Sequence, residues 1–341
     1  MLKPDYVYLD YVKFCGRIVD YKDVDDYVRS AFRVIDRRGN PTFYIKYKDD
    51  NGNDDWRECE SAMAFSAMNH RIPFRVNTGT AEEPDIEERT MFAHVNRNWP
   101  RLCKPYEKLV MKQYLKRDGP PKLSSKTFNT FTGYPHSEMS DEEYDKAMMP
   151  GTESRRLFDI IDVHFTDALA AGNPVFDKYQ RFWWSYVLRD GWNKVGTSLY
   201  YYGKEGSGKG LALVKLMSQG IIGRKHCWVC TNLKRFTGNF SAHRWGKVAI
   251  VFNECSDLAN GGEWDKLKAI IADDEFVHEA KHKAQYMCSE TAAYCFISNW
   301  KNAVKLGNTD RRYACQQMSS EKLGDRVYFT KLAEACESPV G

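Results

Sequence analysis

The sequence predicts an α/β fold, in which a mostly parallel sheet lies between helices and follows a helical segment and a smaller mixed α+β N-terminal domain. Three observations lead to this prediction. Apolar strand-like runs alternate with helical stretches after residue 190. Apolar residues recur every three to four positions between 155 and 190. A glycine-rich turn over 203–210 stands between a strand-like run and a helical one.

The chain length indicates more than one structural unit. At 341 residues the chain is longer than a typical domain, so separate cores are expected. We expect an N-terminal domain over 1–120, a connector and helical collar over 121–190, and the α/β core over 191–341. Within the connector, residues 116–155 are rich in Pro, Gly, Ser and charge, which predicts little regular structure.

Composition excludes some classes of protein. No apolar run approaches the roughly 20 residues of a membrane span, and the N-terminus does not resemble a signal peptide. We therefore expect a soluble intracellular protein, in the cytoplasm or nucleus of a host cell, with no membrane partner. Ten scattered cysteines favour reduced thiols over a disulfide framework. The net charge of +4 permits a nucleic-acid partner without arguing for one.

Two local patterns predict elements before the glycine-rich turn. The β-forming run 42–47 precedes a charged turn that contains Asn51-Gly52, which is typical of a hairpin. The residues Leu157, Ile161 and Phe165 then recur at helical spacing. The first pattern belongs to the mixed N-terminal domain and the second to the helical segment.

The glycine-rich turn has the composition of a phosphate-binding loop. Glycines let the backbone bend until several N–H groups point inward, and the helix that begins at residue 211 adds its positive dipole end. Lysine in this context can reach the β- and γ-phosphates of a nucleotide. Because residue 210 is glycine, where the usual hydroxyl would hold Mg²⁺, the metal must be held by other residues. The predicted phosphate-binding residues are Gly203, Gly206, Ser207, Gly208, Lys209 and Gly210.

A second strand-like run, 248–254, ends in the polar pair Asn253-Glu254. Beside a phosphate loop, a carboxylate in this position can polarise an attacking water and hold Mg²⁺ through water. Glu254 is the candidate for that role. Asn253 stands where a metal-binding acid is usual, and its amide oxygen is a weaker ligand.

Two further segments complete the predicted nucleotide site. The strand-like run 292–297 ends in Ser298-Asn299, and Asn299 can hydrogen-bond a γ-phosphate or a water if this strand lies between the other two. Arg311 and Arg312 precede the strand-like run 313–317. Adjacent arginines beside a strand are usually a solvated face, but in a ring of subunits one of them can stabilise charge on a neighbour's transferring phosphoryl group.

A basic hairpin tip indicates a polymeric substrate. A helical stripe that includes Leu267 and Ile271 precedes two β-forming runs, 276–280 and 284–288. The tip between these runs is wholly basic, and it can project towards a phosphate backbone. A basic turn on an ordinary surface hairpin is the alternative. The tip residues are Lys281, His282 and Lys283.

Together, the order and spacing of these segments resemble a superfamily 3 helicase core, the AAA+ type of P-loop ATPase carried by small DNA viruses, phages and plasmid-like elements. Residues 129–134 and Phe240 are also similar to phage and poxvirus-type primase-helicases. The specific match covers 195–320 and is looser over 120–195. For residues 1–120 it implies a helicase-associated domain. The matching segments are 203–210 (Walker A), 248–254 (Walker B), 264–283 (helix and hairpin), 296–299 (sensor 1) and 310–312 (arginine finger).

The resemblance implies a role for each matched residue. Lys209 would bind phosphates, Glu254 would activate water and Asn299 would sense the γ-phosphate. One of the two arginines would act on a neighbouring subunit. Lys281 and His282 match the pair with which viral members grip DNA.

The implied activity is that of an ATP-dependent DNA helicase or translocase in viral or mobile-element replication. It would use ATP and Mg²⁺, bind single-stranded or forked DNA, form a homo-oligomer of the hexamer type and work with a primase or polymerase module. Two alternatives stay open. An ATP-gated initiator or loader with weak hydrolysis is favoured by Gly210 and Asn253. A P-loop motor acting on another substrate, such as a packaging ATPase or an RNA-remodelling relative, is the second.

Overall fold

The computed structural model divides the chain into two compact units, one formed by 1–110 with 122–132 and the other by 111–121 with 133–341. It describes residues 18–37, 40–48, 54–59, 73–80, 82–90, 93–94, 97–98, 101, 105–115, 118–135, 139–190, 193–238, 241–254, 261–279, 285–303 and 310–338.

The first unit mixes short strands with helix. Its described elements are α2 (Tyr21–Ala31), the antiparallel set β2 (Phe32–Arg37), β3 (Asn40–Lys48) and β4 (Asp54–Cys59), the set β1 (Ile18–Val19), β5 (Pro73–Asn77) and β6 (Ile86–Thr90), and the parallel pair β7 (Lys108–Val110) and β8 (Thr127–Asn129). The hairpin predicted around Asn51-Gly52 is confirmed in its strands, since Lys48 of β3 pairs with Asp54 of β4. The turn itself lies outside the described residues.

The second unit is built on a five-stranded sheet in which all neighbouring strands are parallel. The strand order is β10-β11-β14-β9-β15. This confirms the predicted parallel sheet between helices. The strands are β9 (Ser198–Tyr202), β10 (Cys227–Cys230), β11 (Ala249–Asn253), β14 (Ala293–Ser298) and β15 (Tyr313–Gln317).

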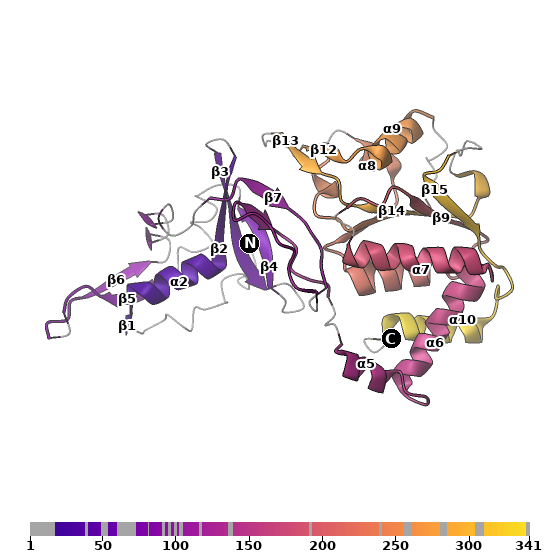
Figure 1. Ribbon diagram of the computed structural model, residues 1–341, viewed down its shortest axis with the longest axis horizontal. Helices are drawn as coiled ribbons and strands as arrows, with labels where there is room; N and C mark the ends of the chain where they lie inside the picture. The colour runs from indigo at the N-terminus through magenta and orange to yellow at the C-terminus, as the bar shows by residue number, and fades with distance from the viewer. Residues whose placement is uncertain are drawn as a thin grey trace. The chain divides into compact units, whose positions relative to one another are not determined.

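Helices cover both faces of this sheet (Figure 1). On one face, α8 (Leu233–Thr237) and α9 (Gly261–Ala272) bury an apolar cluster against strand residues that include Tyr200, Phe252 and Phe296. On the other face, Tyr201 points towards α7 (Pro174–Arg189), where it meets the ring of Phe176. Neighbouring residues of β9 thus serve opposite faces, as the alternation of side chains along a strand requires.

The remaining described elements of the second unit lie before, between and after the strands. They are α5 (Asp141–Ala147), α6 (Glu153–Val163), the π-helices η3 (His164–Leu169) and η4 (Gly210–Ile222), the short 3-10 helices η5 (Ala242–Arg244) and η7 (Lys301–Ala303), the antiparallel hairpin β12 (Glu275–His278) with β13 (Tyr286–Ser289), and α10 (Arg326–Glu337). The helix predicted before the hairpin and the two hairpin strands are therefore confirmed.

The expectation of little regular structure over 116–155 is wrong. This stretch contains β8, all of α5 and the start of α6. A local signal for α5 was present, because Ser140 and Glu143 form a capping box at its first turn. The Pro and Gly residues of this stretch favour turns, but the capping box stabilises the start of α5. Among the described helices, none combines the length and the apolar character needed to cross a membrane.

Candidate functional site

The glycine-rich loop connects β9 to η4 and is stabilised from within by its own lysine. Gly206 and Gly208 have φ values of +79° and +89°, which side chains other than glycine rarely adopt. The Nζ of Lys209 donates hydrogen bonds to the carbonyl oxygens of Gly203 and Lys204, both at 2.8 Å. The lysine is thereby held at the mouth of the loop, beside the N-terminal N–H groups of η4. Such a set of donors suits an anion.

An open cavity of about 620 Å³ lies over this loop. It brings together most of the residues that the sequence singled out. Gly203 is not part of its lining and lies beneath the loop, where an added Cβ would approach the Cβ of Met318 to 3.1 Å. The lining residues are Glu205, Gly206, Ser207, Gly208, Lys209, Gly210, Leu211, Val214, Lys215, Asn253, Glu254, Ile297, Asn299 and Phe329.

The strand order explains why Asn299 belongs to this cavity. Strand β14 is inserted between β11 and β9, so its carboxyl end lies between Glu254 and the glycine-rich loop. The Nδ2 of Asn299 donates to Oε1 of Glu254 across 3.3 Å. The Oδ1 of Asn299 is buried and has no hydrogen-bond partner among the described residues. A ligand or water that donates a hydrogen bond would satisfy that oxygen.

Glu254 has an unusual backbone for its residue type. Its φ is +51°, in the left-handed region, and its N–H donates to the carbonyl oxygen of Ile297 at 3.1 Å. The chain therefore turns sharply at the end of β11 and directs the exposed Glu254 side chain to the cavity. Left-handed backbone in a residue other than glycine costs about 1–2 kcal/mol and is concentrated at functional sites.

The charge of Lys209 is affected by its surroundings. Burial lowers the pKa of Lys209, while the nearby carboxylates of Glu254 and Glu205 act in the opposite direction. A buried cation is stabilised by further negative charge. The cavity is therefore suited to a polyanionic ligand.

Asn253 and Glu254, the residues predicted to hold a cation, both line this cavity, together with the carboxylate of Glu205. No group of three or more His, Cys, Asp or Glu side chains is arranged to hold a metal ion within the described part of the chain. Mg²⁺ is commonly bound by one or two carboxylates together with substrate phosphates, and it keeps several waters. One carboxylate and one amide oxygen beside a phosphate site fit that pattern.

Arg311 and Arg312 lie at the opposite edge of the sheet, away from the cavity. The carbonyl oxygen of Arg312 accepts a hydrogen bond from the N–H of Ser198, the first residue of β9. Five-residue strands separate this edge from the loop by about 16 Å. The arginines border a second cavity of about 480 Å³, which is lined by Lys194, Gly196, Thr197, Ile271, Ala272, Asp274, Asp310, Arg311 and Arg312.

The predicted basic tip, Lys281, His282 and Lys283, falls outside the described residues, but the base of its hairpin is described. Arg244 forms a buried ion pair with Glu290, which directly follows β13. The guanidinium of Arg244 also lies 4.4 Å from the ring centroid of Phe276 in β12. These contacts attach the hairpin to the segment that precedes β11.

Sequence reasoning missed the residues that support the loop from below. His164 of η3 and Phe329 of α10 both approach Gly208, and Tyr328 hydrogen-bonds His164. No local pattern marks these residues, because their contacts join positions 164, 208 and 328, which are far apart in the chain. The apolar stripe before residue 190 placed His164 in a helical region and gave no sign of its neighbour.

Comparison with known proteins adds a family match and a shared fold. Residues 201–312 match a family described as "Family of unknown function (DUF5906)", and no curated protein matches the sequence. The apo structure of the NrS-1 C-terminal region (305–718) is similar with a TM-score of 0.60 at 15% identity, over 93% of this chain and 68% of that chain. The A form of the same apo region gives 0.58 at 14% identity, over 93% and 66%.

The chain thus spans about two thirds of the NrS-1 region that it matches. At this level of identity the likeness shows a common fold. The structure of SCCmec type IV Cch, an active helicase, matches with a TM-score of 0.38 at 10% identity, over 89% of this chain and 56% of that chain. That similarity is too low to carry an argument.

Proposed function

We propose that this chain is an ATP-dependent DNA helicase or translocase that serves the replication of a virus or mobile element, with a superfamily 3, AAA+ type P-loop core over 191–341. The observation that carries the proposal is the single cavity that unites the glycine-rich loop, Lys209, Glu254 and Asn299. Each supplies one component of phosphoryl-transfer chemistry: donors for the phosphates, a cation, a carboxylate and an amide. The fold shared with the NrS-1 region is compatible with this proposal.

The glycine-rich loop and Lys209 bind the phosphates of ATP. The first N–H groups of η4 have no side-chain cap and are available to a phosphate, and Lys209 exchanges the carbonyl oxygens of Gly203 and Lys204 for phosphate oxygens. A bound Mg²⁺ ion would neutralise developing phosphate charge, and Asn253 and Glu254 would hold it together with its waters.

Glu254 accepts a proton from the attacking water, and Asn299 orients that water or the γ-phosphate. The hydrogen bond between Asn299 and Glu254 holds the two side chains next to each other, and the free Oδ1 of Asn299 is available to the water. General-base catalysis of this kind contributes roughly 10²–10⁴-fold to a rate.

The arginine pair favours a ring of subunits. Arg311 and Arg312 cannot reach the cavity of their own subunit across the length of β9 and β15. In a homo-hexamer one of the two arginines would lie at the neighbouring cavity and stabilise the transferred phosphoryl group. Lys281, His282 and Lys283 at the hairpin tip would then move single-stranded or forked DNA, and a primase or polymerase module would act on the separated strands.

Steady-state ATP hydrolysis with and without single-stranded DNA tests this function. We expect DNA-stimulated turnover in the wild type, no turnover in Lys209→Ala, and turnover without DNA stimulation in Lys281→Ala. Lys22→Ala, in the first unit, is the matched control. A wild type that forms no ring and hydrolyses ATP at one rate with or without DNA contradicts the helicase assignment.

An ATP-gated initiator or loader is the second candidate. It is favoured by Gly210, which supplies no hydroxyl for Mg²⁺, and by Asn253, a weaker ligand than the usual acid. Tight ATP binding with negligible hydrolysis under every condition would select it, whereas strand displacement on a forked duplex would reject it.

A further inference from the structure

We propose that His164 is a positioning residue that holds the glycine-rich loop in its phosphate-binding shape. This inference rests on the proposed binding of ATP at that loop. His164 begins η3 and is completely buried, with 0% of its surface exposed. It does not line the cavity, so it acts through the loop and not on the nucleotide.

The imidazole of His164 lies directly against Gly208. A Cβ added to Gly208 would lie 2.4 Å from Cε1 and 2.7 Å from Nε2 of the ring, far inside van der Waals contact. The same Cβ would lie 3.0 Å from Cε1 of Phe329. The Gly208 backbone is therefore enclosed from below by two rings, and the loop cannot sink towards the core without displacing one of them.

The orientation of the imidazole is fixed from its other side. Its Nδ1 lies 2.8 Å from the hydroxyl of Tyr328, whose helix α10 is capped by a hydrogen bond from the Tyr328 N–H to Oδ1 of Asp325. Burial lowers the pKa of His164 to about 4, with the Gly208 backbone acting in the opposite direction. The ring is therefore neutral near pH 7 and carries one N–H hydrogen.

The hydrogen of that neutral ring is assigned from its neighbours. Nε2 faces the Gly208 backbone and Nδ1 faces the Tyr328 hydroxyl, so we assign the hydrogen to Nε2, with Nδ1 accepting from the Tyr328 hydroxyl. Within the described residues no atom completes hydrogen-bond geometry with Nε2. The contact is thus a close approach of the Nε2 side of the ring to the Gly208 backbone.

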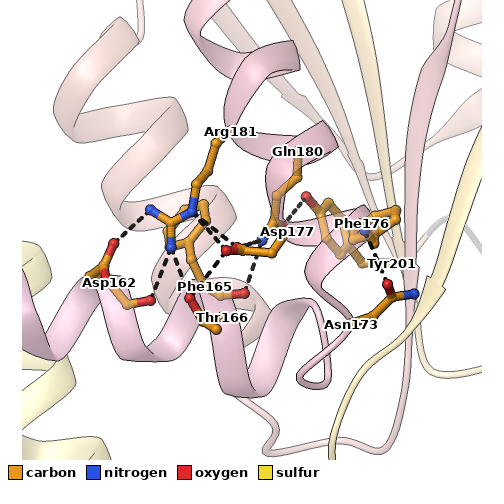
Figure 2. A network of polar contacts seen from close by, with 9 residues as sticks. All are labelled: Asp162, Phe165, Thr166, Asn173, Phe176, Asp177, Gln180, Arg181 and Tyr201. Atoms are coloured by element: carbon orange, nitrogen blue, oxygen red, sulfur yellow. Dashed lines mark hydrogen bonds and ion pairs between the residues drawn. The ribbon is translucent and has the colours of Figure 1, made fainter.

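A partly buried polar network connects η3, which begins with His164, to α7 and β9 (Figure 2). Arg181 of α7 donates to Oδ1 of Asp162 at 2.6 Å and to Oγ1 of Thr166 at 2.9 Å, on either side of His164 in sequence. Gln180 donates from Nε2 to the carbonyl oxygen of Phe165 at 2.9 Å and accepts from the hydroxyl of Tyr201 at 2.8 Å.

Because Tyr201 belongs to β9, from which the loop emerges, the network ties the support to the strand that carries the loop. The helix η3 that carries His164 and the strand β9 that leads to Gly208 are therefore connected by hydrogen bonds. A side chain that only filled space would not require this orientation.

The test compares nucleotide affinity in the full chain with three substitutions. His164→Leu keeps the volume but removes both ring nitrogens, and His164→Gln restores an amide N–H near the position of Nε2. His243→Leu is the control, because His243 is a partly buried histidine of the same unit that packs on Trp228 and does not contact Gly208. The probe is a fluorescent ADP analogue with Mg²⁺, followed by KM and kcat for ATP.

We expect His164→Leu to weaken nucleotide binding about tenfold or more and to raise KM more than it lowers kcat, because the loop would contact the phosphates in the ground state as well as in the transition state. His164→Gln should recover most of the affinity, and the control should stay within about twofold of the wild type. If His164→Leu fails to fold, Tyr328→Phe takes its place, and we expect the same loss of affinity. That substitution removes the hydroxyl that orients the imidazole and keeps the aromatic ring of residue 328.

If His164→Leu binds the probe within twofold of the wild type, the role of His164 is overturned while ATP binding stays in place. The same holds for Tyr328→Phe if His164→Leu does not fold. An equal loss of affinity in His164→Leu and His164→Gln would mean that His164 contributes only packing, and this result also overturns the inference. A wild type that does not bind the probe overturns the proposed function, and the inference with it.

Discussion

The left-handed backbone of Glu254 makes stability and catalysis separable at one position. The φ of +51° costs about 1–2 kcal/mol in any residue that carries a Cβ, and glycine avoids that cost. Glycine has a more flexible unfolded chain, which takes back about 0.5–1 kcal/mol. We therefore expect Glu254→Gly to be more stable than Glu254→Ala by about 1 kcal/mol, although both variants lose the carboxylate and hence hydrolysis.

The assay is thermal unfolding of the full chain, followed by calorimetry. The transition of the second unit is identified by its rise on adding ADP, because a ligand stabilises the unit that binds it. For a domain of about 150–250 residues, 1 kcal/mol corresponds to a Tm difference of roughly 2–4 °C. The same pair of substitutions at Asn253 is the control, since that residue ends a strand with ordinary backbone and glycine there should be the less stable variant.

Three results would refute this reasoning in different ways. Equal Tm values for the Gly and Ala variants at position 254 would mean that the backbone there is not strained. A stabilising effect of glycine at position 253 as well would point to a general effect of this loop. Loss of a general base lowers a rate by roughly 10²–10⁴-fold, so a much smaller fall in ATP hydrolysis in Glu254→Gly would show that Glu254 is not the general base.

Three further predictions concern groups beyond Glu254. Between pH 6.5 and 5 the unfolded state protonates His164 and the folded state does not, so the wild type should lose about 1.6 kcal/mol of unfolding free energy that His164→Gln keeps. Parallel pH slopes in urea titrations would contradict this. Mixing the double variant Arg311→Ala/Arg312→Ala with Glu254→Gln should restore ATP hydrolysis that neither variant has, because the mixture contains an interface with an intact carboxylate and intact arginines; no gain over the separate variants would argue against action between subunits. Glu290→Gln should lower stability by about 3–5 kcal/mol, measured by chemical unfolding, because it leaves the buried Arg244 charge uncompensated, and a loss below about 1 kcal/mol would show that the pair is solvated.

The sequence by itself determined the local features of the core. The strand, glycine-rich turn and helix around Lys209 depend on residues within a short segment, and glycine conformation and apolar periodicity are local properties. The hairpin after α9 and the polar ends of β11 and β14 were predicted for the same reason. The wrong prediction of little regular structure over 116–155 also concerned a local feature, since the capping box at Ser140 indicates the start of α5.

Only the tertiary structure decided how these pieces meet. The insertion of β14 between β11 and β9 brings Asn299 to Glu254, and nothing in either segment encodes that pairing by itself. At the left-handed turn, the N–H of Glu254 donates to the carbonyl oxygen of Ile297, which lies 43 residues further along the sequence. The contact of His164 with Gly208 likewise joins segments that share no sequence pattern. Such contacts follow from packing between distant segments, which periodicity over a few residues does not record.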